Sequence, residues 1–125
     1  MYNLHMDTIR IRQSQTTSWP AAVEGALRDL QAALLEMYGR QAPHVLLYGS
    51  YARGEADEDS DVDVLLLYPG QVAAGREIQR LGGILAELNL RYQVLISALP
   101  VSQADWQNAH SAFWNNVRRE GVALA

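Results

Sequence analysis

The sequence predicts one domain of the α/β type, in which helices pack against a sheet. Apolar patterns typical of helices and of strands alternate along the chain, with no internal repeat and no linker between them. The run Leu65-Leu66-Leu67 is apolar at every position, as expected for a strand covered on both faces. At 125 residues, the chain has the length of one domain and can bury a core.

The N-terminal segment is expected to differ from the rest of the chain. Residues 1–17 are mostly polar apart from the alternation Ile9-Arg10-Ile11, which predicts a tail or a short edge strand. Residues 18–125 are predicted to form the domain. The segment has no apolar signal core, and no apolar run is long enough to span a membrane, so we expect a cytoplasmic protein without a membrane partner.

The first helix is predicted from an apolar stripe. Apolar residues recur every three or four positions, as on one face of a helix: Val23, Leu27, Leu30, Leu34 and Met37. Ser18 is expected to be the N-cap, with Trp19 and Pro20 in the first turn. Gly39 is placed to end the helix.

Three strands and a second long helix follow in the prediction. The strands are the segments "HVLLY", "DVDVLLLY" and "RYQVLIS", at residues 44–48, 61–68 and 91–97. Residues 71–89 predict the helix, with Ile78, Leu81, Leu85 and Leu88 on one side. Gly82-Gly83 would weaken this helix or let another backbone approach closely.

A last helical region is predicted from a capping pattern. Ser102 is followed three residues later by Asp105, which resembles a capping box, and Gly121 is placed to close the region. The aromatic residues at helical spacing, Trp106, Phe113 and Trp114, are expected mainly in the core. Tryptophan beside arginine is also favoured at partner surfaces, and that alternative stays open.

Composition excludes several kinds of site. The chain has no cysteine, so disulfides and thiolate chemistry are excluded. Its histidines, His5, His44 and His110, lack zinc-ligand spacing. The net charge of −4 disfavours binding to a phosphate backbone, so a nucleic-acid partner is not expected.

Two carboxylates enter the second predicted strand together. Residues two apart in a strand share a face, so Asp61 and Asp63 are expected to point the same way and repel each other. A divalent cation would resolve the repulsion, and oxygen ligands of this kind suit Mg²⁺. The alternative is that residues 55–63 form a solvated acidic loop, as most acidic runs do.

Gly49-Ser50 directly follows the first predicted strand. A glycine here lets a phosphate approach the backbone, where N–H groups and the serine hydroxyl can hold it. The alternative is an ordinary turn from strand to helix. The segment is not a Walker A loop, because the second glycine and the Gly-Lys-Ser/Thr ending are missing.

The Gly-Ser pair and the two aspartates together form a more specific pattern than either feature alone. Gly49-Ser50, ten residues from Tyr51 to Ser60, and then Asp61-Val62-Asp63 resemble the pattern of the nucleotidyltransferase superfamily related to DNA polymerase beta. The resemblance is closest to its minimal members, the MNT proteins. It extends over roughly residues 20–120.

The resemblance implies a fold and a reaction. The fold would be of the α/β (α+β) class, with a mixed β-sheet flanked by helices, as in polymerase beta-like nucleotidyltransferases. The reaction would transfer a nucleoside monophosphate, with Mg²⁺ held by the catalytic acids Asp61 and Asp63. Gly49 and Ser50 would bind the terminal phosphates of the nucleoside triphosphate. Arg53 and Ser60 would make further phosphate contacts, unless Arg53 pairs with the surrounding acids.

One feature departs from the family pattern. Active members usually carry a third carboxylate on a later strand, and the matching position here is expected at Gln93. An amide cannot accept a proton as a general base. No acid occurs between Asn89 and Gln103.

The resemblance also implies partners. MNT proteins are typically paired with HEPN-domain toxins, and some act as antitoxins by adenylylating the toxin, with ATP as the usual donor. Two functions follow: an AMP-transferring antitoxin enzyme, or a catalytically degenerate subunit that binds a nucleotide or a partner. A homodimer or a hetero-oligomer is compatible with both.

Overall fold

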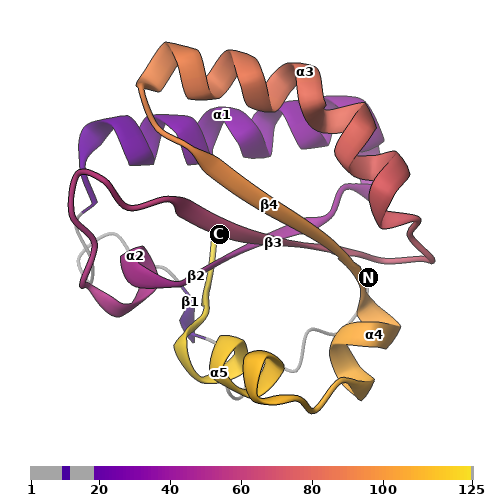
Figure 1. The fold of residues 1–125 in the computed structure, drawn as a ribbon. Helices are drawn as coiled ribbons and strands as arrows, with labels where there is room; N and C mark the ends of the chain where they lie inside the picture. Colours follow the sequence, from indigo (N-terminus) through magenta and orange to yellow (C-terminus); the bar gives the residue numbers. More distant parts are fainter. Residues whose placement is uncertain (1–9, 12–18, 125) are drawn as a thin grey trace.

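The computed structural model describes residues 10–11 and 19–124 and shows a mixed five-stranded sheet flanked by helices, as predicted (Figure 1). The strand order is β1-β5-β2-β3-β4. In chain order the strands are β1 (Arg10–Ile11), β2 (His44–Tyr48), β3 (Val62–Tyr68), β4 (Ile96–Ser102) and β5 (Val122–Ala123). Strand β2 is antiparallel to β3 and β5, whereas β3 is parallel to β4 and β1 to β5.

Helices cover both faces of the sheet. On one face lie α1 (Ala21–Tyr38) and α3 (Ala74–Tyr92), and on the other lie α4 (Gln103–Asn108) and α5 (Ala112–Glu120) (Figure 1). Strand β3 contributes side chains to the hydrophobic core on each face of the sheet. Val64 and Leu66 pack with the α1–α3 layer. Leu65 and Leu67 pack with Trp106 of α4 on the other face. The prediction that the leucine run is buried on both faces is confirmed.

Helix α1 begins later than predicted. Its N-cap is Pro20, whose extended ψ of 147° lies outside the helix, so placing Trp19 and Pro20 in the first turn was wrong. Trp19 turns inward instead, and its indole Nε1 donates to the Tyr51 carbonyl over 3.3 Å. The proposed N-cap Ser18, the tail up to residue 9 and His5 lie outside the described residues. Gly39 ends the helix with φ +57°, as predicted.

The predicted apolar faces of the two long helices are buried only in part. Leu81 and Leu88 of α3 are fully buried, whereas Met37 of α1 and Ile78 of α3 are exposed. A Cβ added at Gly82 or Gly83 would meet nothing within 4 Å, so no neighbouring chain approaches closely there. Among the described residues, no helix is both long and apolar enough to cross a membrane.

The third predicted strand begins too early. Arg91 and Tyr92 complete α3, and β4 starts only at Ile96. Tertiary contacts to α1 explain the longer helix: Arg91 Nη1 donates to Asp29 over 3.1 Å, and the Tyr92 hydroxyl donates to the same carboxylate. The Tyr92 ring lies against Gly25, where any Cβ would collide with it.

The C-terminal helical region is two helices. The Ser102 hydroxyl accepts from the Asp105 N–H at the start of α4, which confirms the predicted cap. A second N-cap, Ser111, starts α5, and Gly121 ends it. Strand β5 was not predicted, because two residues carry no periodicity. Two short helical segments complete the fold, η2 (Gly39–Gln41) and α2 (Ser50–Arg53).

Candidate functional site

The antiparallel pairing of β2 with β3 brings the two halves of the Gly-Ser and Asp-any-Asp pattern together. Tyr48, the last residue of β2, lies opposite Asp63 of β3, so Gly49 follows directly beside this carboxylate. Gly49 caps α2 with φ +77° and ψ −156°, a positive-φ conformation that essentially only glycine adopts. A Cβ added there would also collide with Oδ2 of Asp63. Glycine is therefore required by the backbone conformation and by the carboxylate.

A cavity of about 330 Å³ opens at this point, and we call it the Gly-Ser cavity. Four of the predicted site residues line it: Gly49, Ser50, Arg53 and Asp63. Its opposite wall is α5, which contributes Phe113, Asn116 and Glu120. The sequence pattern gave no signal for these three residues, because they reach the site only through the packing of α5 on the sheet.

The environment of Asp63 disfavours its charge. The side chain is half-buried, and this burial raises the pKa of the Asp63 carboxyl above its ordinary value. The negative charge of Asp61 raises the pKa further, while the Arg53 guanidinium lowers it in part. A cation bound at Asp63 would relieve the first two effects.

Arg53 is held between two acids. Its Nε donates to Glu55 over 2.8 Å, and its Nη1 donates to Oε2 of Glu120 over 3.1 Å. The hydrogen bonds to Glu55 and Glu120 are the main cause of the raised pKa of Arg53. The Glu120 bond connects α2 to α5 across the cavity, so the guanidinium lies where it could meet a phosphate.

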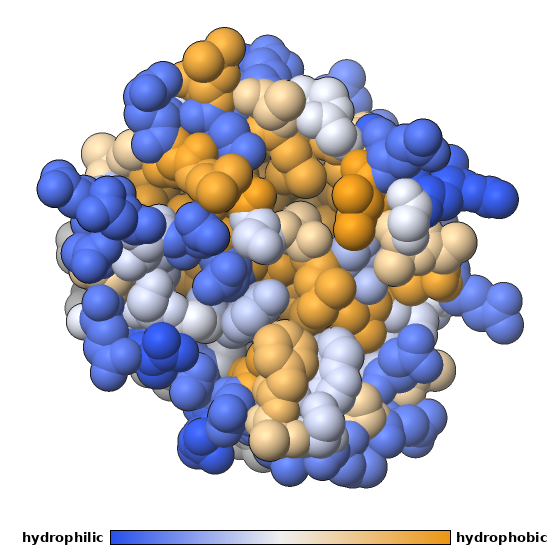
Figure 2. Space-filling model, viewed as in Figure 1, coloured by the Kyte–Doolittle hydropathy of each residue, from blue (hydrophilic) through white to orange (hydrophobic). Residues whose placement is uncertain are grey.

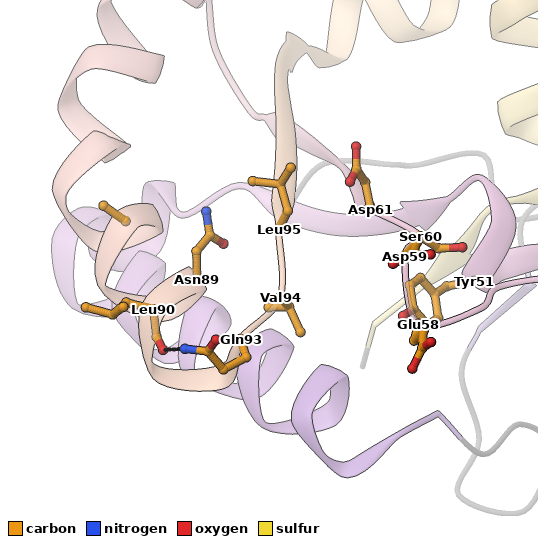
Figure 3. Close-up of a pocket in the computed structure, with 11 residues that line it drawn as sticks. Tyr51, Glu58, Asp59, Ser60, Asp61, Asn89, Leu90, Gln93, Val94 and Leu95 are labelled. Carbon is orange, nitrogen blue, oxygen red and sulfur yellow. Dashed lines mark hydrogen bonds between the residues drawn. The ribbon is translucent and has the colours of Figure 1, made fainter.

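Asp61 and Ser60 lie at a different opening. Asp61 is exposed and precedes β3, and together with Ser60 it lines a second cavity of about 610 Å³ (Figure 3). The Ser60 hydroxyl accepts from the Asp57 N–H over 2.9 Å and donates to the Asp57 carboxylate over 3.3 Å. Ser60 therefore shapes the acidic loop, and its role as a phosphate contact stays a prediction.

Gln93 is not on a strand. It is the C-cap of α3 in a left-handed conformation with φ +56°, and its amide Nε2 donates to the Leu90 carbonyl over 2.7 Å (Figure 3). The β4 residue in register with Asp63 is Ser97. The placement of Gln93 on the third strand was wrong, although β4 itself carries no carboxylate.

The carboxylates of Asp61 and Asp63 fit a hard cation whose remaining ligands come from phosphate and water. No group of three or more potential ligands for a metal ion is found among residues 10–11 and 19–124. The pair Asp61 and Asp63 supplies carboxylate oxygens, which suit Mg²⁺ when phosphate oxygens and waters complete its octahedron. These two residues are the ones that would hold the ion.

The chain is similar to known proteins over most of its length. The nucleotidyltransferase domain family matches residues 27–116. From Methanocaldococcus jannaschii, "Putative protein adenylyltransferase MJ0141" is 46% identical over 72 residues, 58% of this chain and 68% of that relative. "Putative protein adenylyltransferase MJ0604" from the same organism is 32% identical over 102 residues, 81% of this chain and 96% of that relative. A crystal structure of a "putative nucleotidyltransferase" from Sulfolobus solfataricus has a TM-score of 0.47 at 16% identity, covering 86% of this chain and 89% of that one.

Proposed function

The chain belongs to the nucleotidyltransferase domain family, as its sequence pattern predicts, and on this premise we propose that it transfers AMP from Mg-ATP to a hydroxyl group of a protein acceptor. The observation that carries the proposal is the contact between Gly49 and Asp63, because it joins a phosphate-accessible backbone to a carboxylate. The two relatives named as protein adenylyltransferases support AMP as the transferred group and a protein as the acceptor.

The residues of the Gly-Ser cavity have separate tasks in this proposal. The backbone at Gly49 and the Ser50 hydroxyl bind the terminal phosphates, and Arg53 adds positive charge beside them. The acceptor oxygen bonds to the α-phosphorus, the bond from that phosphorus to the β-phosphate oxygen breaks, and pyrophosphate leaves. The hydroxyl proton passes to solvent or to a nearby base. Mg²⁺ held by Asp61 and Asp63 would neutralise the charge that develops on the phosphates.

The biological setting is proposed from the MNT resemblance. The acceptor would be a HEPN-domain toxin, which the chain would inactivate as the antitoxin of a two-component system in the cytoplasm. A hetero-oligomer with the toxin fits this role better than a homodimer, because the transfer needs the toxin at the site.

A second function is favoured by one observation. Strand β4 places Ser97, and no acid, beside Asp63. A positioned general base contributes about 10²–10⁴-fold to a rate, so a chain without one would transfer slowly. The second candidate is therefore a subunit that binds Mg-ATP or its partner without efficient transfer.

Thermal unfolding with and without Mg-ATP tests the shared premise. A ligand at about a hundred times its Kd adds roughly 2.7 kcal/mol, which raises the Tm by several degrees in a domain of this size. We expect this rise in wild type and in Glu36→Gln, an exposed α1 control, and no rise in Asp61→Asn/Asp63→Asn. A flat wild-type response would contradict nucleotide binding. Where the rise occurs, pyrophosphate release with a HEPN-domain acceptor separates the enzyme from the binding subunit.

A further inference from the structure

The second cavity has two unlike walls, and we call it the α3–β4 groove (Figure 3). One wall comes from the end of α3 and the turn into β4; it exposes Leu90 and Leu95 beside the amides of Asn89 and Gln93, and we call it the apolar wall. The other wall is the acidic loop, with Glu58, Asp59 and Asp61. We propose that this groove docks a segment of the acceptor protein that carries basic and apolar residues around the hydroxyl to be modified. The inference rests on the proposed function and names where its acceptor binds.

The groove lies next to the candidate catalytic acids, at the start of β3. The Val62 N–H donates to the Leu95 carbonyl over 2.8 Å, which fixes the apolar wall beside the start of β3. Asp61 directly precedes Val62 and faces the groove, whereas Asp63 lines the Gly-Ser cavity. Residues two apart in a strand are separated by about 7 Å. A side chain lying over Leu95 is therefore within reach of the place where the phosphates would bind.

The apolar wall is preformed. Three hydrogen bonds hold the turn between α3 and β4. The Gln93 side chain donates to the Leu90 carbonyl, and the Val94 N–H donates to the Asn89 carbonyl over 3.2 Å. The Ile96 N–H donates to the Asn89 side chain over 2.9 Å. This gives Gln93 and Asn89 a role that does not depend on a metal. A turn ordered in advance loses little conformational entropy when a peptide docks on it.

The acidic wall is preformed as well. Asp57 organises it by accepting from the Asp59 N–H over 2.9 Å and by exchanging hydrogen bonds with Ser60. These bonds orient the loop while Glu58, Asp59 and Asp61 remain exposed. Both walls therefore have a defined shape before any partner binds.

The chemistry of the walls selects the occupant. Leu90 and Leu95 are 74% and 55% exposed, so apolar side chains of a partner would remove a substantial hydrophobic surface from water. Figure 2 shows hydrophobic residues lying among hydrophilic ones on the face that carries α3 and β4. No lysine or arginine is among the residues lining the groove.

Charge decides between the kinds of partner. Lysine or arginine in the acceptor segment would pair with the acidic wall, whereas a nucleic acid would be repelled by it. A second copy of this chain is disfavoured too, because its net charge is −4. A basic and apolar peptide with a hydroxyl group is the occupant that matches both walls.

Amide chemical shifts of the ¹⁵N-labelled chain, measured without nucleotide, test the proposal. Two peptide pools are titrated: one has a fixed tyrosine, serine or threonine flanked by lysine, arginine and leucine, and the other replaces the basic residues with acidic ones. We expect the basic pool to shift amides at Leu90, Leu95 and residues 58–61, with at least tenfold weaker effects from the acidic pool. Leu95→Ser, which removes apolar surface without adding charge, should weaken binding of the basic pool at least tenfold, whereas Leu35→Ser, at a 63% exposed leucine of α1, should leave that binding unchanged.

Several outcomes would overturn the docking site. They are the absence of shifts at the groove, equal shifts from both pools, equal binding of the basic pool by the Leu95→Ser and Leu35→Ser chains, or groove shifts that depend on protein concentration alone and so report a second copy. Unfolding curves of both variants show that each is folded. Because no nucleotide is present, a loss of Mg-ATP binding would refute the proposed function without removing peptide shifts at the groove.

Discussion

Asp61 and Asp63 are two residues apart, yet they lie in different surroundings. Asp63 is half-buried against Gly49, with Tyr48 on one neighbouring strand and Ser97 on the other. Asp61 is exposed and faces the α3–β4 groove. The same side chain is thus part of a packed cavity at one position and of an open surface at the other. The strand pattern predicted the pair, but packing gave each acid different surroundings.

The largest expected effect comes from filling the space beside Asp63. Gly49→Ala combines a strained positive φ with a collision against the carboxylate, and we expect about 2–5 kcal/mol of destabilisation and loss of the Mg-ATP response. Chemical denaturation and the thermal shift measure both effects. Gly54→Ala is the control for a positive φ without a collision, since Gly54 is left-handed, with φ +73° and ψ 24°, and has open space around it. If the two variants lose equal free energy of unfolding, the collision with Asp63 does not contribute to the destabilisation.

A smaller effect is expected from the charge of Asp63, measured in EDTA. Because the folded-state pKa lies above the ordinary value of 3.8, the stability contributed by this group is complete below that pH and is lost as the pH rises through the raised pKa. The stability of Asp63→Asn relative to wild type should therefore rise from about pH 4 and level off once the pH exceeds the raised pKa. Denaturation curves across this range measure the difference.

The Asp61→Asn variant sharpens the same comparison. Removing the charge of Asp61 takes away one of the two causes that raise the pKa of Asp63, so this pKa should move back towards its ordinary value without reaching it. An NMR titration of the Asp63 carboxyl would report the change. A constant stability difference between Asp63→Asn and wild type at all pH values would contradict the role of burial.

The smallest expected effect concerns Arg53. Glu120 brings negative charge into the Gly-Ser cavity, whereas Glu55 binds the same guanidinium without lining that cavity. Glu120→Gln should strengthen Mg-ATP binding by up to about fivefold, or ~1 kcal/mol, because exposed ion pairs contribute little and the Arg53 Nη1, no longer paired with Glu120, can turn to phosphate. Glu55→Gln should change it less. Calorimetric titration decides, and weaker binding in Glu120→Gln would instead make Glu120 part of the binding site.

The sequence by itself determined the features that depend on neighbouring residues. The apolar stripe of α1, the strands of "HVLLY" and "DVDVLLLY", and the cap of α4 by Ser102 follow from spacing over a few positions. The residue types and spacing from Gly49 to Asp63 belong to this group, whereas the antiparallel pairing of β2 with β3, which brings the two ends of the pattern together, was not predicted. The same residues predicted the family, and the family match over residues 27–116 confirms it.

Only the tertiary structure decided the rest. Whether Arg91 and Tyr92 continue a helix or start a strand depends on Asp29 and Gly25 of α1, more than sixty residues away. Because these contacts extend α3, Gln93 caps the helix and lines the α3–β4 groove instead of lying on the strand. The wall that α5 adds to the Gly-Ser cavity depends likewise on packing against the sheet. Periodicity reports which face of an element is apolar, but it does not report which distant element covers that face, and here the covering elements complete both cavities.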